Sequence, residues 1–221
     1  MPSFSGKILV SLNRRQLILR SSAGLLLAGT VLPAMPAFAQ SVDVEELMKP
    51  GALPDKVLGS EDAPLTIVEY ASMTCGHCAN FHKNTYPHLK KEYVETGKAR
   101  FVFREFPLDP VASAAFMLAR SVPEDKYFEV VDFMFAEQRA WAFTQDPYNS
   151  LLNFAKQIGF TQESFEKVLT DQALLDGINA TRDRASSQFG VDSTPTFFFN
   201  GNKVNGAISP EELDKEAAKY L

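Results

Sequence analysis

The chain of 221 residues has very little cysteine, and Cys75 and Cys78 are the only two. A structural zinc site takes four Cys or His ligands, usually from two separated pairs. Here the only candidates are these cysteines and three histidines between residues 75 and 88, and His77 would fold back onto the same ion only with difficulty. A four-residue disulfide ring stabilises a protein by only about 2 kcal/mol, against roughly 3 kcal/mol for fifteen residues. We therefore predict neither a metal site nor a structural cross-link.

Residues 1–39 contain no Asp or Glu, and they contain no apolar run long enough to cross a membrane. The run at 23–32 has about ten residues, whereas a bilayer core needs about twenty. A basic start, a short apolar run and small residues at Ala37 and Ala39 predict a cleaved export signal over residues 1–39. A membrane anchor is the weaker alternative. "NRRQLIL" at 13–19 also resembles a twin-arginine signal, so the Sec and twin-arginine routes both stay open.

The chain has no basic stretch. Removing residues 1–39 removes four of the 22 basic residues and none of the 27 acidic ones, so the formal net charge falls from −5 to near −9. An acidic chain of this kind argues against nucleic acid and anionic membrane surfaces as partners. Export predicts a periplasmic location, where thiols meet oxidising conditions.

The sequence also lacks internal repeats and low-complexity tracts, and strand and helix patterns follow one another along it. Residues 40–55 form a short polar lead. "APLTIVEYAS" (63–72) is a run of β-branched and apolar residues that predicts a buried strand. A helix kinked at Pro87 is expected after the cysteines, and "ARFVFREF" (99–106) predicts a second strand.

Helical spacing dominates the next part of the chain, residues 108–190. The strand pattern returns in "TPTFFFNGNKVNG", where Asn200-Gly201 predicts a hairpin turn. Ser209 and Glu212 predict a capping box for a last helix. This order predicts an α/β domain formed by residues 56–107 and 191–221, with an all-helical domain, 108–190, inserted into it.

The spacing of the two cysteines fits a redox pair. If Cys75 precedes the first turn of a helix and Cys78 lies within that turn, their sulfur atoms can reach each other. Cys75 then lies beside free backbone N–H groups and the positive end of the helix, which favour an anion. Such a position lowers the pKa of a thiol and makes its thiolate a good leaving group. His77 adds a positive charge or a hydrogen bond, and Gly76 keeps the loop accessible.

"VEYASMTCGHC", followed far downstream by "STPTFFFNG", resembles the DsbA-type thiol:disulfide oxidoreductases, exported bacterial proteins of the thioredoxin fold. The likeness covers roughly residues 55–221, and the Thr-Pro pair begins 116 residues after Cys78. The resemblance implies a thioredoxin-like fold with an inserted all-helical domain. It also implies an enzyme that needs no cofactor besides its redox-active cysteines.

Individual roles follow from this resemblance. Cys75 corresponds to the nucleophilic, solvent-facing cysteine and Cys78 to the buried resolving one. Thr194-Pro195 corresponds to the cis-proline loop, in which the backbone of Thr194 pairs with an extended substrate strand. The alternative is that Pro195 merely begins a strand.

Glu69 stands inside an otherwise apolar strand, and it resembles the family's buried acid, which relays a proton to and from the resolving cysteine. A buried carboxylate needs a raised pKa or a partner, and Arg104 and Lys98 are the candidate partners. An exposed glutamate on an edge strand is the alternative. The two remaining histidines, His82 and His88, are expected on helix surfaces.

Two features differ from the best-known oxidases of the family. Gly76-His77 replaces Pro-His, and Thr194 replaces the Val before the cis-proline. Gly-His also occurs in protein disulfide isomerases, and Thr-Pro occurs in bacterial isomerases.

The sequence is therefore compatible with three functions. The first is an oxidase that introduces disulfides into exported proteins with free cysteines and is reoxidised by a membrane partner of the DsbB type. The second is an isomerase or reductase on the same scaffold. The third is a thioredoxin-like binding module without turnover.

Overall fold

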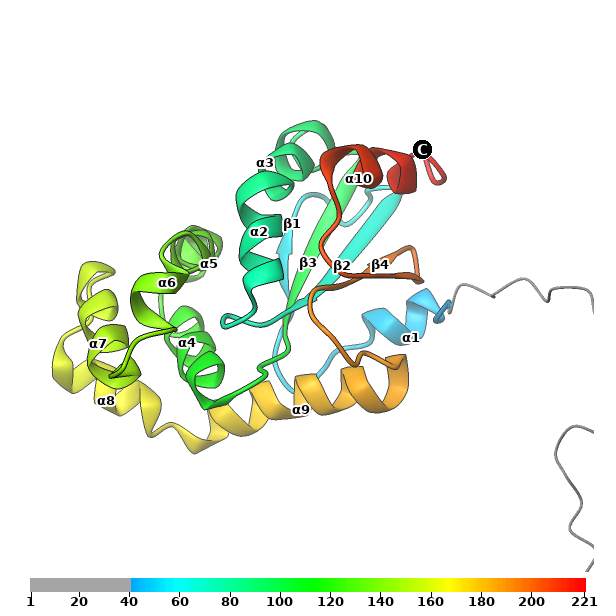
Figure 1. The fold of residues 1–221 in the computed structure, drawn as a ribbon. Helices are drawn as coiled ribbons and strands as arrows, with labels where there is room; N and C mark the ends of the chain where they lie inside the picture. Colours follow the sequence, from blue (N-terminus) through cyan, green and yellow to red (C-terminus); the bar gives the residue numbers. More distant parts are fainter. Residues whose placement is uncertain (1–40) are drawn as a thin grey trace, which may run out of the picture. The chain divides into compact units, whose positions relative to one another are not determined.

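The structure is a computed structural model that describes residues 41–221 (Figure 1). The export signal predicted over 1–39 lies outside these residues. The centre of the fold is a five-stranded sheet in the order β1-β3-β2-β4-β5. β2 and β3 are parallel, and the other neighbours are antiparallel. The strands are β1 (Lys56–Leu58), β2 (Leu65–Ala71), β3 (Ala99–Glu105), β4 (Thr196–Phe199) and β5 (Asn202–Asn205).

Helices surround this sheet on both faces. Those that precede or directly follow the first strands are α1 (Val44–Met48), α2 (Gly76–Asn84), α3 (Tyr86–Leu89) and a π-helical turn, η1 (Lys90–Val94). Between β3 and β4 the chain forms α4 (Pro110–Arg120), a 3₁₀ turn η2 (Glu124–Lys126), α5 (Tyr127–Ala136), α6 (Gln138–Trp141), α7 (Pro147–Gln157), α8 (Gln162–Leu169) and α9 (Gln172–Phe189). The last helix is α10 (Pro210–Ala217).

The predicted strands at 63–72 and 99–106 are confirmed as β2 and β3. The predicted kinked helix is two helices instead, α2 and α3, which meet at Thr85. Pro87 has no N–H to donate to the preceding turn, so it is accommodated in the first turn of α3. The helical run between the two halves of the sheet is present as α4–α9. The domain boundaries at 107/108 and 190/191 stay a prediction.

The two faces of the sheet carry separate cores, because side chains along a strand alternate between faces. On β2, Ile67 and Ala71 belong to the larger core, together with residues of α2, α4, α5 and α10. Val68 and Tyr70 belong to the smaller core, which α1 and α9 cover. Figure 1 shows α9 along one side of the sheet, with α2, α3 and α10 on the other. Every residue of β2 is buried.

The β4–β5 hairpin has the predicted turn. Asn200 and Gly201 have φ angles of 43° and 86°, and two positive φ angles are what a type I′ turn requires. The Val42 N–H donates to the Gly201 carbonyl at 2.9 Å, so the lead pairs with the hairpin. The lead also contains α1, whose Leu47 is 1% exposed. The sequence pattern missed α1 and the short strand β1.

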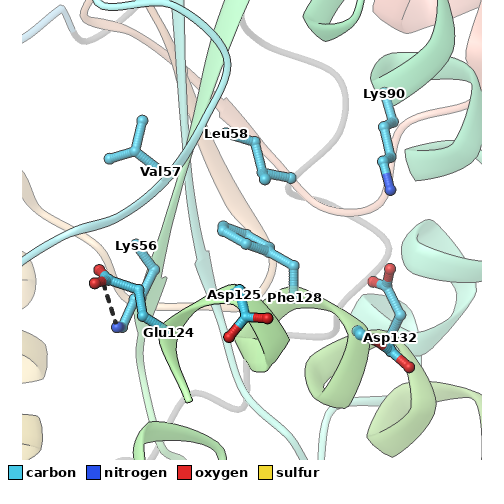
Figure 2. A pocket seen from close by; sticks show the side chains of 9 residues that line it. Lys56, Val57, Leu58, Lys90, Glu124, Asp125, Phe128 and Asp132 are labelled. Atoms are coloured by element: carbon cyan, nitrogen blue, oxygen red, sulfur yellow. Dashed lines mark ion pairs between the residues drawn. The ribbon is translucent and has the colours of Figure 1, made fainter. Parts of the chain in front are cut away.

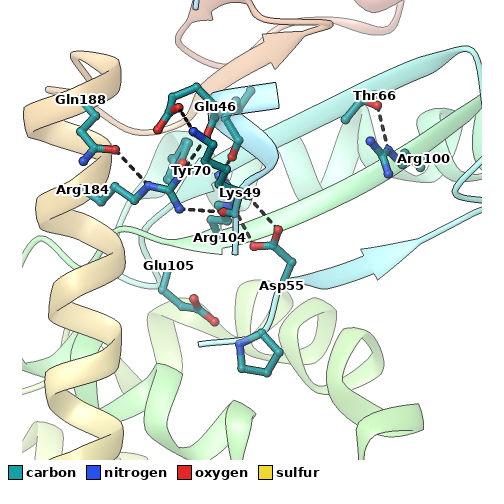
Figure 3. Close-up of polar contacts among 12 residues, drawn as sticks. Glu46, Lys49, Asp55, Thr66, Tyr70, Arg100, Arg104, Glu105, Arg184 and Gln188 are labelled. Atoms are coloured by element: carbon teal, nitrogen blue, oxygen red, sulfur yellow. Dashed lines mark hydrogen bonds and ion pairs between the residues drawn. The ribbon is translucent and has the colours of Figure 1, made fainter. Parts of the chain in front are cut away.

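A network of polar contacts fastens the lead to the smaller core (Figure 3). The Arg104 guanidinium donates to both carboxylate oxygens of Asp55 at 2.8 Å, and to the Leu47 carbonyl and the Tyr70 hydroxyl at 2.8 Å. Arg184 of α9 donates to two main-chain carbonyls of the lead. Arg104 is therefore fully engaged on the face of the sheet that α1 and α9 cover.

Candidate active site

The two cysteines lie where β2 ends and α2 begins. Cys75 is the N-cap residue of α2, with extended backbone, and its sulfur accepts the Cys78 N–H at 3.4 Å. Both cysteines are free thiols. The predicted placement of Cys75 before the first helical turn, with Cys78 inside it, is confirmed.

The second half of the site comes from the loop before β4. The Thr194-Pro195 peptide bond is cis, as expected. The Cys75 thiol donates to the Thr194 carbonyl at 3.2 Å, across 119 residues of sequence. The sheet brings the two segments together because β4 runs antiparallel beside β2.

The two thiols have opposite electrostatic environments. The pKa of Cys75 is lowered from 9.0 to about 5, mainly because the Cys78 thiol donates a hydrogen bond to the Cys75 sulfur. Burial opposes this shift, while the N–H groups of Cys78 and His77 add to it. Burial raises the pKa of Cys78 well above its ordinary value. Cys78 is 0% exposed and Cys75 only 8%, so Cys75 is largely buried rather than solvent-facing as predicted.

The residues between the cysteines are exposed. A side chain at Gly76 would meet no other atom within 4 Å, so the loop is open on this side. His77 is exposed, and the support that it gives to the Cys75 thiolate comes from its main chain. A contribution from the His77 ring stays a prediction.

Glu69 lies in the middle of β2 and is 0% exposed. Because β2 is the central strand, the alternative of an exposed edge-strand glutamate is wrong. Burial raises its pKa, although His82 opposes the shift. The predicted partners are also wrong. Arg104 lies opposite Tyr70 rather than Glu69 in the β2–β3 register and therefore faces the other side of the sheet, and Lys98 is exposed.

The partner of Glu69 is His82, which we expected on a helix surface. Its side chain is 2% exposed, and its Nε2 lies 3.0 Å from Glu69 Oε2. The ring stacks on Phe135 of α5, with centroids 4.2 Å apart. His82 follows Cys78 by four residues, and this spacing places both on the buried face of α2. That signal was available in the sequence. His88 has the predicted surface position and contacts Asp214 at 2.7 Å.

Gln138 of α6 holds the active-site loop from the helical region, and sequence reasoning missed it. Its Nε2 donates to the Met73 carbonyl at 2.8 Å and to the Cys75 carbonyl at 3.0 Å, and the residue is 4% exposed. A second link runs from the Thr74 hydroxyl to the Asp109 carboxylate, at 2.6 Å. No local sequence pattern predicts these contacts, because each joins residues more than thirty positions apart in the chain.

Within residues 41–221, no group of three or more His, Cys, Asp or Glu side chains is placed to hold a metal ion. No helix of this part of the chain has the length and apolar character needed to cross a membrane.

Comparison with known proteins agrees with this geometry. A thioredoxin family model matches residues 52–216. The solved structure of alpha-DsbA1 from Wolbachia pipientis is 30% identical, with a TM-score of 0.72, and the match covers 81% of this chain and 96% of that one. BdbD from Bacillus subtilis, at 20% identity, shares the fold with a TM-score of 0.64 over 75% of this chain and 92% of that one.

A Rickettsia bellii protein named for protein-disulfide oxidoreductase activity is 34% identical over 164 residues, or 70% of this chain. The chain spans 63% of that relative's length. The fold, the site and these matches together define a redox protein of the thioredoxin type. The chain belongs to the thioredoxin family, in its DsbA-type branch with a helical insertion between the two halves of the sheet.

Proposed function

We propose that the protein is a thiol:disulfide oxidoreductase that introduces disulfide bonds into exported proteins through Cys75 and Cys78. One observation carries the proposal: Cys75 is stabilised as a thiolate at the N-terminus of α2, beside the cis-proline loop, while Cys78 is buried as a thiol. A pKa of about 5 lies well below pH 7, so Cys75 is almost entirely ionised at neutral pH. A stabilised thiolate favours the reduced pair and so makes the disulfide oxidising.

The reaction follows from these positions. A substrate thiolate attacks Cys75 Sγ in the Cys75–Cys78 disulfide, the S–S bond breaks, and Cys78 leaves with the electron pair. Cys78 takes up a proton, for which Glu69 is the nearby acid. A second substrate thiolate then attacks the substrate sulfur of the mixed disulfide, and Cys75 leaves as its stabilised thiolate. Substrate loses two electrons, and the cysteine pair gains them.

Thr194 and Pro195 hold the substrate in this proposal. The Cys75 thiol donates to the Thr194 carbonyl, so this acceptor becomes available when Cys75 is ionised or joined to substrate. An extended substrate segment can then pair with the main chain of Thr194. Gly76 and the exposed His77 leave room for the segment on the other side of the sulfur.

The partners and location belong to the same proposal. The substrates are exported proteins with free cysteines, and a membrane partner of the DsbB type restores the disulfide. The periplasmic location depends on export through residues 1–39, by the Sec or the twin-arginine route.

The decisive experiment is a reduction potential measured against glutathione. We expect a value well above the roughly −270 mV of thioredoxin, and a value near that of thioredoxin contradicts the oxidase. Once oxidised glutathione has joined a glutathione to Cys75, Cys78→Ser should form a stable mixed disulfide with a reduced test protein that has a single cysteine, because the test thiolate attacks Cys75 Sγ and glutathione leaves. Cys75→Ser should form none. Equal binding of the test protein by wild type and Cys75→Ser, with no exchange in either, would identify a binding module instead.

The Gly76-His77 dipeptide and Thr194 favour a second candidate, an isomerase or reductase. Refolding of a scrambled disulfide protein separates the two, because an oxidase alone rescues such a substrate poorly. Efficient rescue would establish the isomerase.

A further inference from the structure

Three ionisable side chains form a line from the interior to the surface beside the active site. Glu69 of β2 contacts His82 of α2 at 3.0 Å through Nε2, and His82 contacts Asp132 of α5 at 3.3 Å through Nδ1. We propose that His82 and Asp132 conduct protons between Glu69 and solvent whenever Cys78 ionises or is protonated. The proposal rests on the proposed function, because Cys78 changes protonation only during disulfide exchange.

The inner end of the line has no direct route to water. Cys78 and Glu69 are both 0% exposed. Cys78 and His82 lie one turn apart on the buried face of α2, and Glu69 contacts His82, so Cys78 and Glu69 face the same part of the larger core. Burial, the hydrogen bond with Cys75 and the negative charge of Glu69 all raise the pKa of Cys78. Glu69 Oε1 is buried and has no hydrogen-bond partner among residues 41–221. This oxygen can accept a proton from Cys78 once the two side chains move into hydrogen-bond contact, while Oε2 stays on His82.

Aromatic rings enclose the middle of the line. The His82 ring lies 4.2 Å from the Phe135 ring of α5, 4.8 Å from the Tyr86 ring of α3, and 5.7 Å from the Phe103 ring of β3. Glu69, Asp132 and Tyr86 are the titratable groups that face it, and burial raises the pKa of Tyr86, so that this phenol stays neutral. The hydrogen-bonded path from Glu69 therefore runs through the two ring nitrogens of His82.

The outer end reaches the surface. The Asp132 side chain is 39% exposed and lines a pocket of about 560 Å³. Figure 2 shows Asp132 at one side of this pocket and the Lys56–Glu124 ion pair at the other. A proton that arrives at Asp132 can therefore pass to water. Because both ring nitrogens of His82 contact carboxylates, each can exchange a proton with one of them.

The pKa shifts agree with this geometry. Burial opposes a charge on His82, but the charge of Glu69 and hydrogen bonds to Asp132 and Glu69 outweigh burial and raise the pKa of His82 to about 9. Burial raises the pKa of Glu69. The Glu69–His82 pair thus holds a proton at neutral pH that it can give or replace.

During reoxidation of the reduced pair, the proton of Cys78 has to leave the buried site. Cys75 is already joined to an oxidant sulfur, and the Cys78 S–H bond breaks as its proton passes to Glu69. The pair of Glu69 and His82 then holds one proton more than before, and His82 Nδ1–H gives one to Asp132 and so to water. The Cys78 thiolate attacks Cys75 Sγ, the mixed disulfide breaks, and the oxidant thiolate leaves with the electron pair. The protein thus releases one proton to water, and this balances the proton that Cys78 has lost.

Oxidised glutathione separates the two chemical steps. Release of the first glutathione requires only the Cys75 thiolate, whereas release of the second requires Cys78 to lose its proton. We expect Asp132→Asn to change the first rate less than about twofold and to slow the second about tenfold or more at pH 7. His82→Gln should slow the second step at least as much, and Asp132→Glu should restore it. Rapid quenching and mass spectrometry measure both steps between pH 5 and 9.

Asp125→Asn is the matched control. This change also removes a carboxylate from the pocket, but Asp125 has no contact with His82 in the described part of the chain. We expect both steps within about twofold of wild type. If Asp132→Asn matches Asp125→Asn in the second step and its pH profile, the proposal is overturned even if His82→Gln is slow or unstable. If wild type releases no second glutathione, the proposed function fails instead.

Discussion

Cys75 and Cys78 show how position alone separates two identical side chains. The Cys75 sulfur lies ahead of the first turn of α2 and accepts the Cys78 N–H, which has no carbonyl partner within the helix. Three residues later, Cys78 points into the core and has lost its contact with water. One thiol is therefore stabilised as an anion, and the other is held neutral.

This contrast predicts that one thiol of the reduced protein ionises at an unusually low pH. The ultraviolet absorbance of the thiolate should rise with pH with a midpoint of about 5, and Cys75→Ser should remove that transition. A midpoint near the ordinary value of 9.0 would contradict the electrostatic environment described here.

The same shift predicts how stability changes with pH. Between pH 5 and 9 the unfolded chain binds a proton at Cys75 that the folded reduced protein does not, so the free energy of unfolding rises with pH. The contribution is fully present above pH 9 and is lost as pH falls through 5. Denaturant unfolding of the reduced wild type against Cys75→Ser should show this difference, and parallel curves for the two proteins would exclude it.

At the scale of the elements, most strands, turns and helix ends that have a local sequence signal were predicted. β2, β3 and the Asn200-Gly201 turn appear as expected because their residues suffice to define them. The capping box of Ser209 and Glu212 is likewise complete within four residues. α1 was missed because a helix of five residues has no stripe long enough to recognise, and it is held by distant contacts from α9.

The hairpin turn offers a test of one such distant contact. A Cβ on Gly201 would lie 2.2 Å from the Val42 carbonyl oxygen, whereas one on Gly206 would meet nothing within 4 Å. Both glycines have positive φ, 86° and 84°. Both alanine variants therefore carry a backbone strain of about 1–2 kcal/mol. Only Gly201→Ala should in addition displace the lead, which faster proteolysis near residue 42 would reveal. Equal cleavage of the two variants would show that the lead tolerates the change.

Gln138 tests the link between the helical region and the active-site loop. Gln138→Met keeps the length of the side chain but leaves the buried Met73 carbonyl without this donor, at a cost of about 1–3 kcal/mol in the free energy of unfolding. Arg139→Met, at an exposed neighbour on the same helix, is the control and should cost less than about 0.5 kcal/mol. Denaturant unfolding compares them. Equal stability would mean that α6 does not hold the loop.

At the scale of the whole molecule, the site depends on contacts that no local pattern contains. The CGHC segment and the Thr-Pro pair were predictable because each is a short motif. The Glu69–His82–Asp132 line was not predicted, since it needs β2, α2 and α5 to pack together and two charged groups to face an aromatic core. Glu69 was expected to be buried, but its partner depended on which face of the sheet each neighbouring residue occupies.

The two faces of the sheet divide function from anchoring. The two cysteines and the Glu69–His82–Asp132 line lie on the face of the larger core. Arg104 and Asp55 hold the lead to the other face (Figure 3). Changes in the anchoring network should therefore alter stability without altering the chemistry of Cys75.

Asp55→Ala tests this division. It leaves the Arg104 guanidinium, whose side chain is 5% exposed, without its carboxylate, and loss of one partner of a buried ion pair costs about 3–5 kcal/mol. Adding Arg104→Met removes the stranded charge and should recover part of that loss in a urea double-mutant cycle. Glu129→Gln, which breaks the exposed pair with Lys126, should leave the free energy of unfolding almost unchanged, because water screens such a pair. The Cys75 thiolate should still titrate near pH 5 in Asp55→Ala, because its stabilising groups lie on the opposite face. A shifted titration in this variant would show that the two faces are coupled, and a cost as small as that of Glu129→Gln would show that the lead is held by other contacts.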